Sequence, residues 1–279
     1  MRLKYWKGTA GMTRVEDNLN NKTGNYIFPF FWQNGADEQT LQTELLKIYE
    51  SNIRAFCVEA RPHPDYAGER WWHDMDIIMD FARTHDMKVW LLDDDRFPTG
   101  HANKIFNGGN HPLSVRFLTV HNTDVYGPMK PGYLLVKSIF QEDDVFVGAV
   151  AYKRCSEEDD SLNLESAVDV TGYIQNGWLR WEVPEGLWRI LVFYITRHGN
   201  GKLDYFNIID SDSVKLLLEQ VYEPHYARYG ADFGKTFMGF FSDEPEFSNL
   251  PGYEFRARLG KDMPFIPWSR NLEQGCRKD

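Results

Sequence analysis

Hydrophobic and polar positions in the first third of the chain follow the pattern expected for strands that alternate with helices. Three short apolar runs are typical of buried strands, because they are rich in aromatic and β-branched residues. Between them lie two segments whose apolar residues recur every three or four positions, as on one face of a helix. The expected order is strand 25–33, helix 37–51, strand 53–59, helix 71–85 and strand 87–92. Such alternation predicts a parallel sheet with right-handed crossovers.

The pattern changes to short alternating runs between about residues 117 and 200, which is typical of antiparallel strands. The expected strands are 133–140, 145–153, 178–183 and 187–196, and Pro184-Glu185-Gly186 is expected to form a hairpin turn between the last two. The acidic stretch 156–161 is expected to be a solvated loop. A helical pattern over 211–229 and an apolar run over 237–242 then resume the alternation of helix and strand seen in the first third of the chain.

These patterns predict an α/β fold, with a partial (β/α)₈ TIM-barrel-like parallel sheet interrupted by an antiparallel β-sandwich-like insertion. We expect three βα units in residues 1–116, the inserted β domain in 117–200, and the fourth βα unit with a tail in 201–279. A closed barrel needs eight strands and about 250 residues, so four strands leave it incomplete. We therefore expect the N-terminal part of a longer enzyme, whose open sheet edges would allow a homo-oligomer to form.

Composition narrows the classes of function. The formal net charge is −10 and no Lys/Arg cluster forms a stripe, which argues against a nucleic-acid partner. No stretch is long and apolar enough for a membrane span, and no signal peptide is recognisable, so a cytoplasmic location is expected. Cys57, Cys155 and Cys276 show no metal-ligand or disulfide spacing. Some of the nine Trp and fourteen Tyr are expected to form a sugar-stacking surface.

The apolar run 237–242 ends abruptly in three carboxylates, Asp243, Glu244 and Glu246, around Pro245. Proline cannot donate to a sheet ladder, so the strand is expected to stop where the acids begin. Catalytic groups of α/β barrels lie at the carboxyl ends of the strands, and glycosidic bonds are cleaved by carboxylates held there. We assign the general acid to Glu244, whose pKa would be raised by burial and by Asp243 and Glu246, with Glu246 as the alternate acid.

The other strand ends carry side chains that we expect to bind sugar hydroxyls or rings, or to tune the acid. These substrate-binding candidates are Trp32, Glu59, Arg61, His63, Trp72, Asp94, Asp95 and His101. Two alternatives stay open. The acids 93–95 could cap a following helix or pair with Arg96 and Arg61, and Trp71 and Trp72 could be a packing pair at a helix start. No cofactor is predicted, although three adjacent acids leave room for a structural divalent cation such as calcium.

Several segments together resemble a known family. They are FPFFWQNG (28–35), EARPHPD (59–65), WWHDMD (71–76), VWLLDD (89–94) with FPTG (97–100), and VPEGLWR (183–189). They resemble bacterial glycoside hydrolases similar to the α-L-rhamnosidases of glycoside hydrolase family 106, over about residues 25–260. The resemblance implies a (β/α)₈ catalytic domain with a β insertion that acts on glycosides. It also implies a second catalytic carboxylate on a later strand, beyond the residues of this chain.

The expected function is therefore hydrolysis of a glycosidic bond in a plant or microbial glycan by carboxylate acid–base chemistry, with α-L-rhamnosides among the candidate substrates. A non-catalytic carbohydrate-binding protein is the first alternative. An inactive fragment of a larger glycosidase is the second, and a metal-dependent hydrolase is the weakest. Fold alone does not choose among them, because barrels host many chemistries.

Overall fold

The computed structural model describes residues 19–20, 27–109, 111–199, 203–246 and 265–272, and contacts divide the chain into two units. Unit 1 comprises the residues up to Phe97 together with Val221–Asp243. Unit 2 comprises Pro98–Gln220 and the residues from Glu244 onward. The segments 1–116, 117–200 and 201–279 expected from the sequence therefore cross this division. None of the helices in the described ranges is long and apolar enough to cross a membrane.

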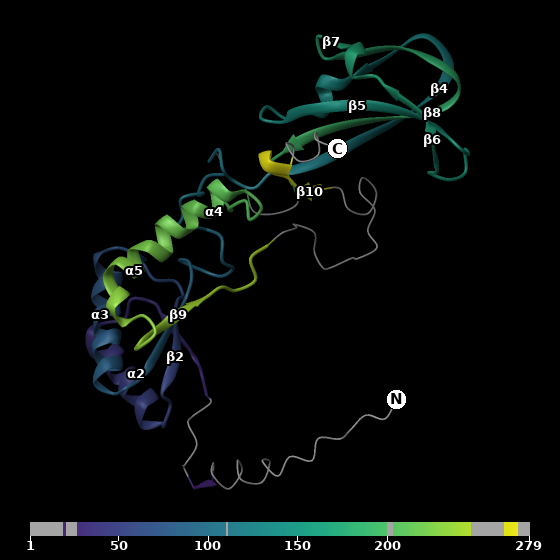
Figure 1. Cartoon of the computed structure of the whole chain (residues 1–279). Coiled ribbons are helices and arrows are strands. Elements are labelled where there is room, and N and C mark those ends of the chain that lie inside the picture. Colours follow the sequence, from purple (N-terminus) through teal and green to yellow (C-terminus); the bar gives the residue numbers. More distant parts are fainter. Residues whose placement is uncertain (1–18, 21–26, 110, 200–202, 247–264, 273–279) are drawn as a thin grey trace, which may run out of the picture. The chain divides into compact units, whose positions relative to one another are not determined.

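Unit 1 is built on a parallel sheet with the strand order β1-β2-β3-β9 (Figure 1). Its strands are β1 (Phe30–Gln33), β2 (Ala55–Ala60), β3 (Lys88–Leu92) and β9 (Phe237–Phe241). Its helices are α2 (Glu38–Glu50), α3 (Glu69–Thr84) and α5 (Glu223–Tyr229). The predicted alternation of strands and helices and the parallel sheet are confirmed. The described residues do not close this sheet into a barrel.

Local sequence explains where helix α2 begins and which side it buries. The carboxylate of Asp37 accepts a hydrogen bond from the backbone N–H of Thr40 (2.9 Å), which caps the first turn. Leu41 and Leu45 lie one turn apart, so they share a face, and both are buried. The apolar spacing therefore places this helix on the sheet.

The two faces of the sheet have different surroundings. The register aligns Phe31 with Val58, and that row continues to Phe240, which packs against Tyr222 just before α5 (ring centroids 4.3 Å apart). This is the face that the helices cover. The next row along the strands points the other way and includes Trp32, which is 58% exposed. Side chains in the row of Trp32 therefore lie on the face opposite the helices.

Unit 2 contains an antiparallel sheet with the strand order β10-β4-β8-β5-β6, and β7 pairs with β8 (Figure 1). Its strands are β4 (Phe117–Leu135), β5 (Val145–Arg154), β6 (Leu162–Asp169), β7 (Ile174–Gln175), β8 (Trp178–Thr196) and β10 (Phe265–Pro267). Short 3₁₀ helices cover Val136–Ile139, Thr171–Tyr173 and, in the other unit, Gly230–Asp232. The sheet curls, and Leu179, Trp181 and Trp188 are among the residues of its buried core. The expected sandwich is thus a single curled sheet in the part of the chain described.

Three details of the β region differ from the sequence prediction. No hairpin turn forms at 184–186, because β8 runs through these residues opposite an equally irregular stretch of β4. Gly127 pairs with Gly186, and a Cβ at Gly127 would lie 1.9 Å from the Pro184 carbonyl oxygen. The expected strand 133–140 ends at Leu135 and turns into a 3₁₀ helix. Residues 265–267, expected in the tail, add strand β10 beside β4.

The helix expected over residues 211–229 is interrupted. Helix α4 (Ser211–Leu217) begins where the side chain of Asp210 accepts from the backbone N–H groups of Asp212 and Ser213. A π-helical turn (Leu218–Tyr222) then leads to α5. Single π-helical turns are frequent at functional sites, and this one contains a residue that contacts the acidic cluster described below.

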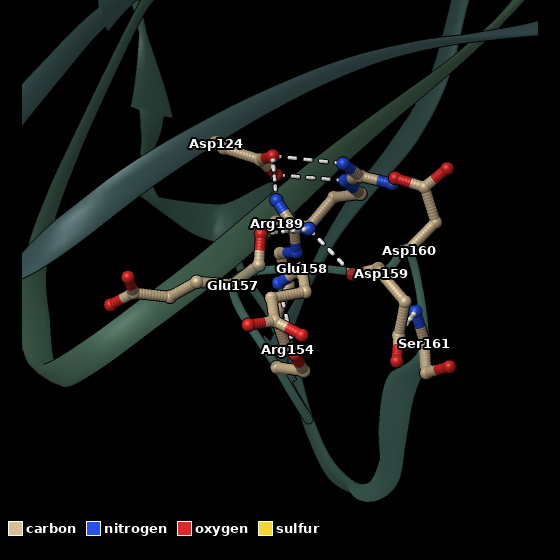
Figure 2. Close-up of polar contacts among 9 residues, drawn as sticks. Asp124, Arg154, Glu157, Glu158, Asp159, Asp160, Ser161 and Arg189 are labelled. Carbon is tan, nitrogen blue, oxygen red and sulfur yellow. Dashed lines mark hydrogen bonds and ion pairs between the residues drawn. The ribbon is translucent and has the colours of Figure 1, made fainter.

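An ion network holds the acidic loop 156–161 against the sheet (Figure 2). Asp124 on β4 accepts hydrogen bonds from Arg189 (2.7 and 2.8 Å) and from Arg154 (2.6 Å). The same arginines reach the loop, where Arg154 donates to the carbonyl oxygen of Asp159 and Arg189 to the carboxylate of Asp160 (3.1 Å). Hydrogen bonds from Arg189 hold the pKa of Asp124 below its usual range. Within this exposed loop, the carboxylate of Asp160 therefore has a structural cation partner.

Candidate functional site

Three residues predicted at the ends of neighbouring strands come together in unit 1. The register aligns Trp32 on β1 with Glu59 on β2, so both side chains lie on the face opposite the helices. Arg61 donates a hydrogen bond to the Glu59 carboxylate, and its guanidinium carbon lies 5.2 Å from the centroid of the Trp32 ring. The same carbon lies 5.7 Å from the ring centroid of Phe97. The result is a carboxyl group beside a cation and two aromatic rings.

Glu59 is the buried member of this group, with only 3% of its surface exposed. Burial raises its pKa, the positive charge of Arg61 opposes that rise, and the negative charge of Asp243 adds to it. Cys57, two residues earlier, has its pKa raised to about 12 by burial and then by the charge of Glu59, with smaller effects of Asp243 and Asp93. The half-buried carboxylate of Asp243, after β9, thus lies within electrostatic range of the buried carboxyl of Glu59 on β2.

The acids 93–95 are all buried at the end of β3. The backbone N–H of Asp93 donates to the Phe241 carbonyl oxygen (2.9 Å), which extends the pairing with β9, and its carboxylate accepts from the Tyr222 hydroxyl. Asp94 has a φ of 85°, a left-handed conformation that costs about 1–3 kcal/mol and is typical of functional sites. Turns rather than a helix follow these acids.

Of the two pairings open for these acids, one forms. Asp95 lies 3.4 Å from the Nε of Arg96, whereas Arg61 pairs with Glu59 instead. The acids of this cluster also act on Tyr66, whose pKa is raised first by burial and then by the charges of Asp94, Asp93 and Asp95. The phenol therefore stays protonated beside them.

A buried aromatic cluster supports the acids from the helix side. Trp71 donates its indole N–H to the Nε2 of His225 (2.9 Å), and its ring packs on His63 and Tyr66 (centroids 5.0 and 4.7 Å). Because Nε2 of His225 accepts, its Nδ1 carries the proton and donates to the Val221 carbonyl oxygen (2.6 Å). The cluster joins α3, α5 and the loop after β2.

His63 and Trp72, both expected to bind substrate, have structural partners. The backbone N–H of Asp65 donates to Nδ1 of His63 (3.2 Å), so Nε2 donates to the Asp74 carboxylate on α3 (3.0 Å). Trp72 lies against His225 (ring centroids 4.7 Å apart), on the helix side of the sheet. The adjacent Trp71 is fully buried. These two tryptophans therefore pack between helices, in line with the packing-pair alternative.

His225 predicts an acid-dependent loss of stability. Burial lowers its pKa from 6.5 to about 4, so folding favours the neutral ring. Its contribution is complete above pH 6.5 and is lost as the pH falls through about 4, by about 1.4 kcal/mol per pH unit and about 3 kcal/mol in total. We expect His225→Gln, whose amide oxygen can still accept from Trp71, to lose less stability than the parent chain between pH 7 and pH 4. Urea unfolding at each pH measures the difference.

The matched control for this comparison is His73→Gln. His73 is an exposed histidine on α3 whose Nε2 lies 3.6 Å from Glu38. Its replacement should leave the pH dependence of unfolding nearly parallel to that of the parent, since surface pairs contribute about 0–1 kcal/mol. Equal slopes for the parent and His225→Gln would contradict the assignment of a neutral buried ring.

The remaining expected site residues lie in unit 2. His101 is buried, with its ring against Tyr205 (centroids 5.3 Å apart), and the backbone N–H of Glu246 donates to the Tyr205 hydroxyl oxygen (3.0 Å). Tyr205 in turn donates to the carbonyl oxygen of Thr99. Glu244 has an exposed side chain and a φ of 42°. Unit 2 thus brings His101 and Glu246 together around one tyrosine.

Metal-ligand geometry occurs at a place that the sequence did not suggest. Within the described residues, one group of acidic and histidine side chains could hold a metal ion, namely Asp143, Asp144 and His198. The Nε2 of His198 lies 2.8 Å from Asp143, and the guanidinium of Arg197 lies 3.6 Å from the same carboxylate. An arginine already supplies positive charge there, which weakens the case for a metal.

Sequence reasoning missed Tyr222, Asp74 and His225 as neighbours of the strand ends. All three lie on helical segments, and only the packing of those segments brings them to the strands. For Tyr222 the local π-helical turn carried no recognisable pattern.

Comparison with solved structures shows a similarity in fold. The chain resembles the structure of a rhamnosidase from Novosphingobium sp. PP1Y, with a TM-score of 0.51 and 10% sequence identity. The match covers 90% of this chain and 40% of the rhamnosidase, so the chain spans less than half the length of that protein. No family model matches the sequence, and no curated protein matches it. At this identity the similarity shows a glycoside-hydrolase-like fold.

Proposed function

We propose that the chain takes part in glycoside hydrolysis at the face of the unit 1 sheet that carries Trp32, Glu59 and Arg61. The observation that carries the proposal is a buried carboxyl with a raised pKa within electrostatic range of a second carboxylate, Asp243. Glycosidic bond cleavage requires such a pair in different protonation states. The fold similarity to a rhamnosidase supports the reaction class and makes α-L-rhamnosides the first substrates to test.

The proposed division of roles follows from burial. Glu59, the more buried acid, holds a proton and donates it to the glycosidic oxygen as the bond to the anomeric carbon breaks. Asp243, half-buried, is the carboxylate that activates water or attacks the anomeric carbon. Water supplies the hydroxyl group and the proton that complete the two products. Trp32 offers an exposed ring on which the sugar can stack, held beside Arg61.

Glu244 and Glu246 remain alternatives for the acid. Glu244 directly follows Asp243 but has an exposed side chain, whereas Glu246 is tied through its backbone to Tyr205. Burial raises the pKa of Glu59, whereas the side chain of Glu244 is exposed. We therefore assign the acid to Glu59.

The proposal is tested by incubating the purified chain with a panel of aryl glycosides, α-L-rhamnoside included, and measuring phenol release. We expect slow but measurable turnover of at least one substrate, which Asp243→Asn should reduce by at least tenfold. Asp86→Asn is the matched control, because Asp86 is an exposed acid paired with Lys88 at the opposite end of the strands. Turnover unchanged in Asp243→Asn, or no turnover by folded chain, would contradict the proposal.

Carbohydrate binding without turnover is the second candidate. It is favoured by the ion pair between Arg61 and Glu59, which stabilises the carboxylate form of the residue that has to be protonated in the first proposal. In that case the same chain would bind a glycoside without releasing the phenol. Binding would weaken in Trp32→Ala and persist in Asp243→Asn.

A further inference from the structure

A hollow on the surface of the unit 2 sheet has features that its fold does not require. It measures about 700 Å³, within the size range of small-molecule sites. It is lined by Tyr133 on β4, Tyr173 in a 3₁₀ helix, Gln175 on β7, Asn176 in the following turn, and Trp178 and Arg180 on β8. All six side chains are exposed.

The strand register puts three of these side chains on the outer face of the sheet. Tyr133 pairs with Arg180 and Leu135 pairs with Trp178, so the four side chains point the same way. Leu179, between Trp178 and Arg180, points to the buried core. The core therefore does not account for a tryptophan and a tyrosine on this face.

The rings remain accessible to a ligand. Tyr133 is 64% exposed, Tyr173 is 52% exposed and Trp178 is 46% exposed. In the described part of the chain, none of the three stacks on another aromatic ring. Three large rings around one hollow exceed the scattered surface aromatics that need no explanation.

The turn at the edge of the hollow is rigidly specified. Asn176 (φ 52°) and Gly177 (φ 80°) form the two-residue connection between β7 and β8, and both adopt the left-handed conformation of a type I′ hairpin turn. Gln175 pairs with Trp178 across this turn. The turn already fixes the backbone of Gln175 and Asn176, whose amide side chains line the same hollow as the Trp178 ring. Binding a ligand there therefore requires little further ordering of the backbone.

We propose that this hollow binds an oligosaccharide. Pyranose rings have an apolar C–H face that packs on the rings of Trp178, Tyr133 and Tyr173, and an equatorial rim of hydroxyls. The amides of Gln175 and Asn176 both donate and accept hydrogen bonds, and the guanidinium of Arg180 donates to paired hydroxyls or to a uronate carboxylate. The chain carries a net charge of −10, and among the residues that the structure describes Arg180 is the single cation lining the hollow, so a phosphate-tracking nucleic-acid site does not fit.

This site shares no lining residue with the carboxylate site of unit 1, and its proposal does not rest on hydrolysis. Isothermal titration of the whole chain with neutral and uronate-containing oligosaccharides tests it. We expect saturable binding of at least one oligosaccharide and at least a tenfold loss of affinity in Trp178→Ala. Tyr126→Ala is the matched control, because Tyr126 is 59% exposed on the same strand as Tyr133 but lies outside the hollow.

A second variant keeps the test valid if Trp178→Ala does not fold. A Cβ at Gly172, which also lines the hollow, meets no atom within 4 Å, so Gly172→Leu should fold and fill the space. We expect it to weaken binding at least tenfold too. No saturable binding by the parent, or equal binding by Gly172→Leu, would overturn the proposal. Loss of hydrolysis with binding intact would contradict only the proposed hydrolase.

Discussion

Glu59→Gln is expected to reduce kcat by about 10²–10⁴-fold, the usual contribution of a general acid. The amide has nearly the shape of the carboxylic acid and can still accept from Arg61, but it has no proton to transfer. Because burial raises the pKa of Glu59, activity should fall at high pH as this group loses its proton, and the variant should lack that alkaline limb. Measurement of kcat and kcat/KM against pH for both proteins tests this.

The leaving group separates an acid from a residue that only binds. An aryl glycoside with an acidic phenol needs little protonation, so Glu59→Gln should affect its cleavage least and affect alkyl or sugar leaving groups most. Glu50→Gln, at an exposed position on α2, is the control and should behave as the parent does. An equal loss on all leaving groups would point to a binding role. Full activity in Glu59→Gln with none in Glu244→Gln would move the acid to Glu244.

The parallel part of the fold could be predicted because its signals are local. Asp37 caps α2 through a neighbour three residues away, and Leu41 and Leu45 mark its buried face within one turn. Parallel topology then brings together strand ends that lie far apart in sequence, which is why Trp32, Glu59 and Arg61 lie close together. These inferences need only the period of the pattern and the direction of the strands.

Other features depend on partners that no local pattern identifies. Pro184 and Gly186 have the composition of a turn, yet β8 continues through them because Gly127 on β4 allows close approach. The three acids after β9 form the more conspicuous motif, so the sequence favoured Glu244. Burial, which distinguishes Glu59 from the exposed Glu244, arises only when β1, β2 and β3 pair. Whether an acid holds its proton depends on its burial in the folded chain, which the positions of acidic residues in the sequence do not reveal.

The buried tryptophan of α3 shows how far the candidate site depends on such contacts. Trp71 is fully buried, and its hydrogen bond to His225 joins residues 154 positions apart in the sequence. Its ring also packs on Tyr66, which lies beside the acids 93–95. A change at Trp71 should therefore reach both the stability of unit 1 and the geometry of the acids.

Trp71→Ala is expected to lower the free energy of unfolding by about 3–5 kcal/mol, the range for removing a large buried aromatic side chain. That is a large share of the roughly 5–15 kcal/mol typical of a folded domain, so Trp71→Phe serves as a milder variant. Phenylalanine keeps part of the packing but leaves the Nε2 of His225 buried without its donor, at a cost of about 1–3 kcal/mol. Trp32→Ala is the matched control, because an exposed side chain should change stability by about 0.5 kcal/mol or less.

Urea unfolding measures the stability of all three variants. A cost for Trp71→Phe no larger than that for Trp32→Ala would contradict the role of the hydrogen bond between Trp71 and His225. The indole of Trp71 donates a hydrogen bond to His225 and packs on Tyr66, which lies beside the acids 93–95. We therefore expect Trp71→Phe to slow the proposed hydrolysis as well, although residue 71 is buried and does not contact the substrate.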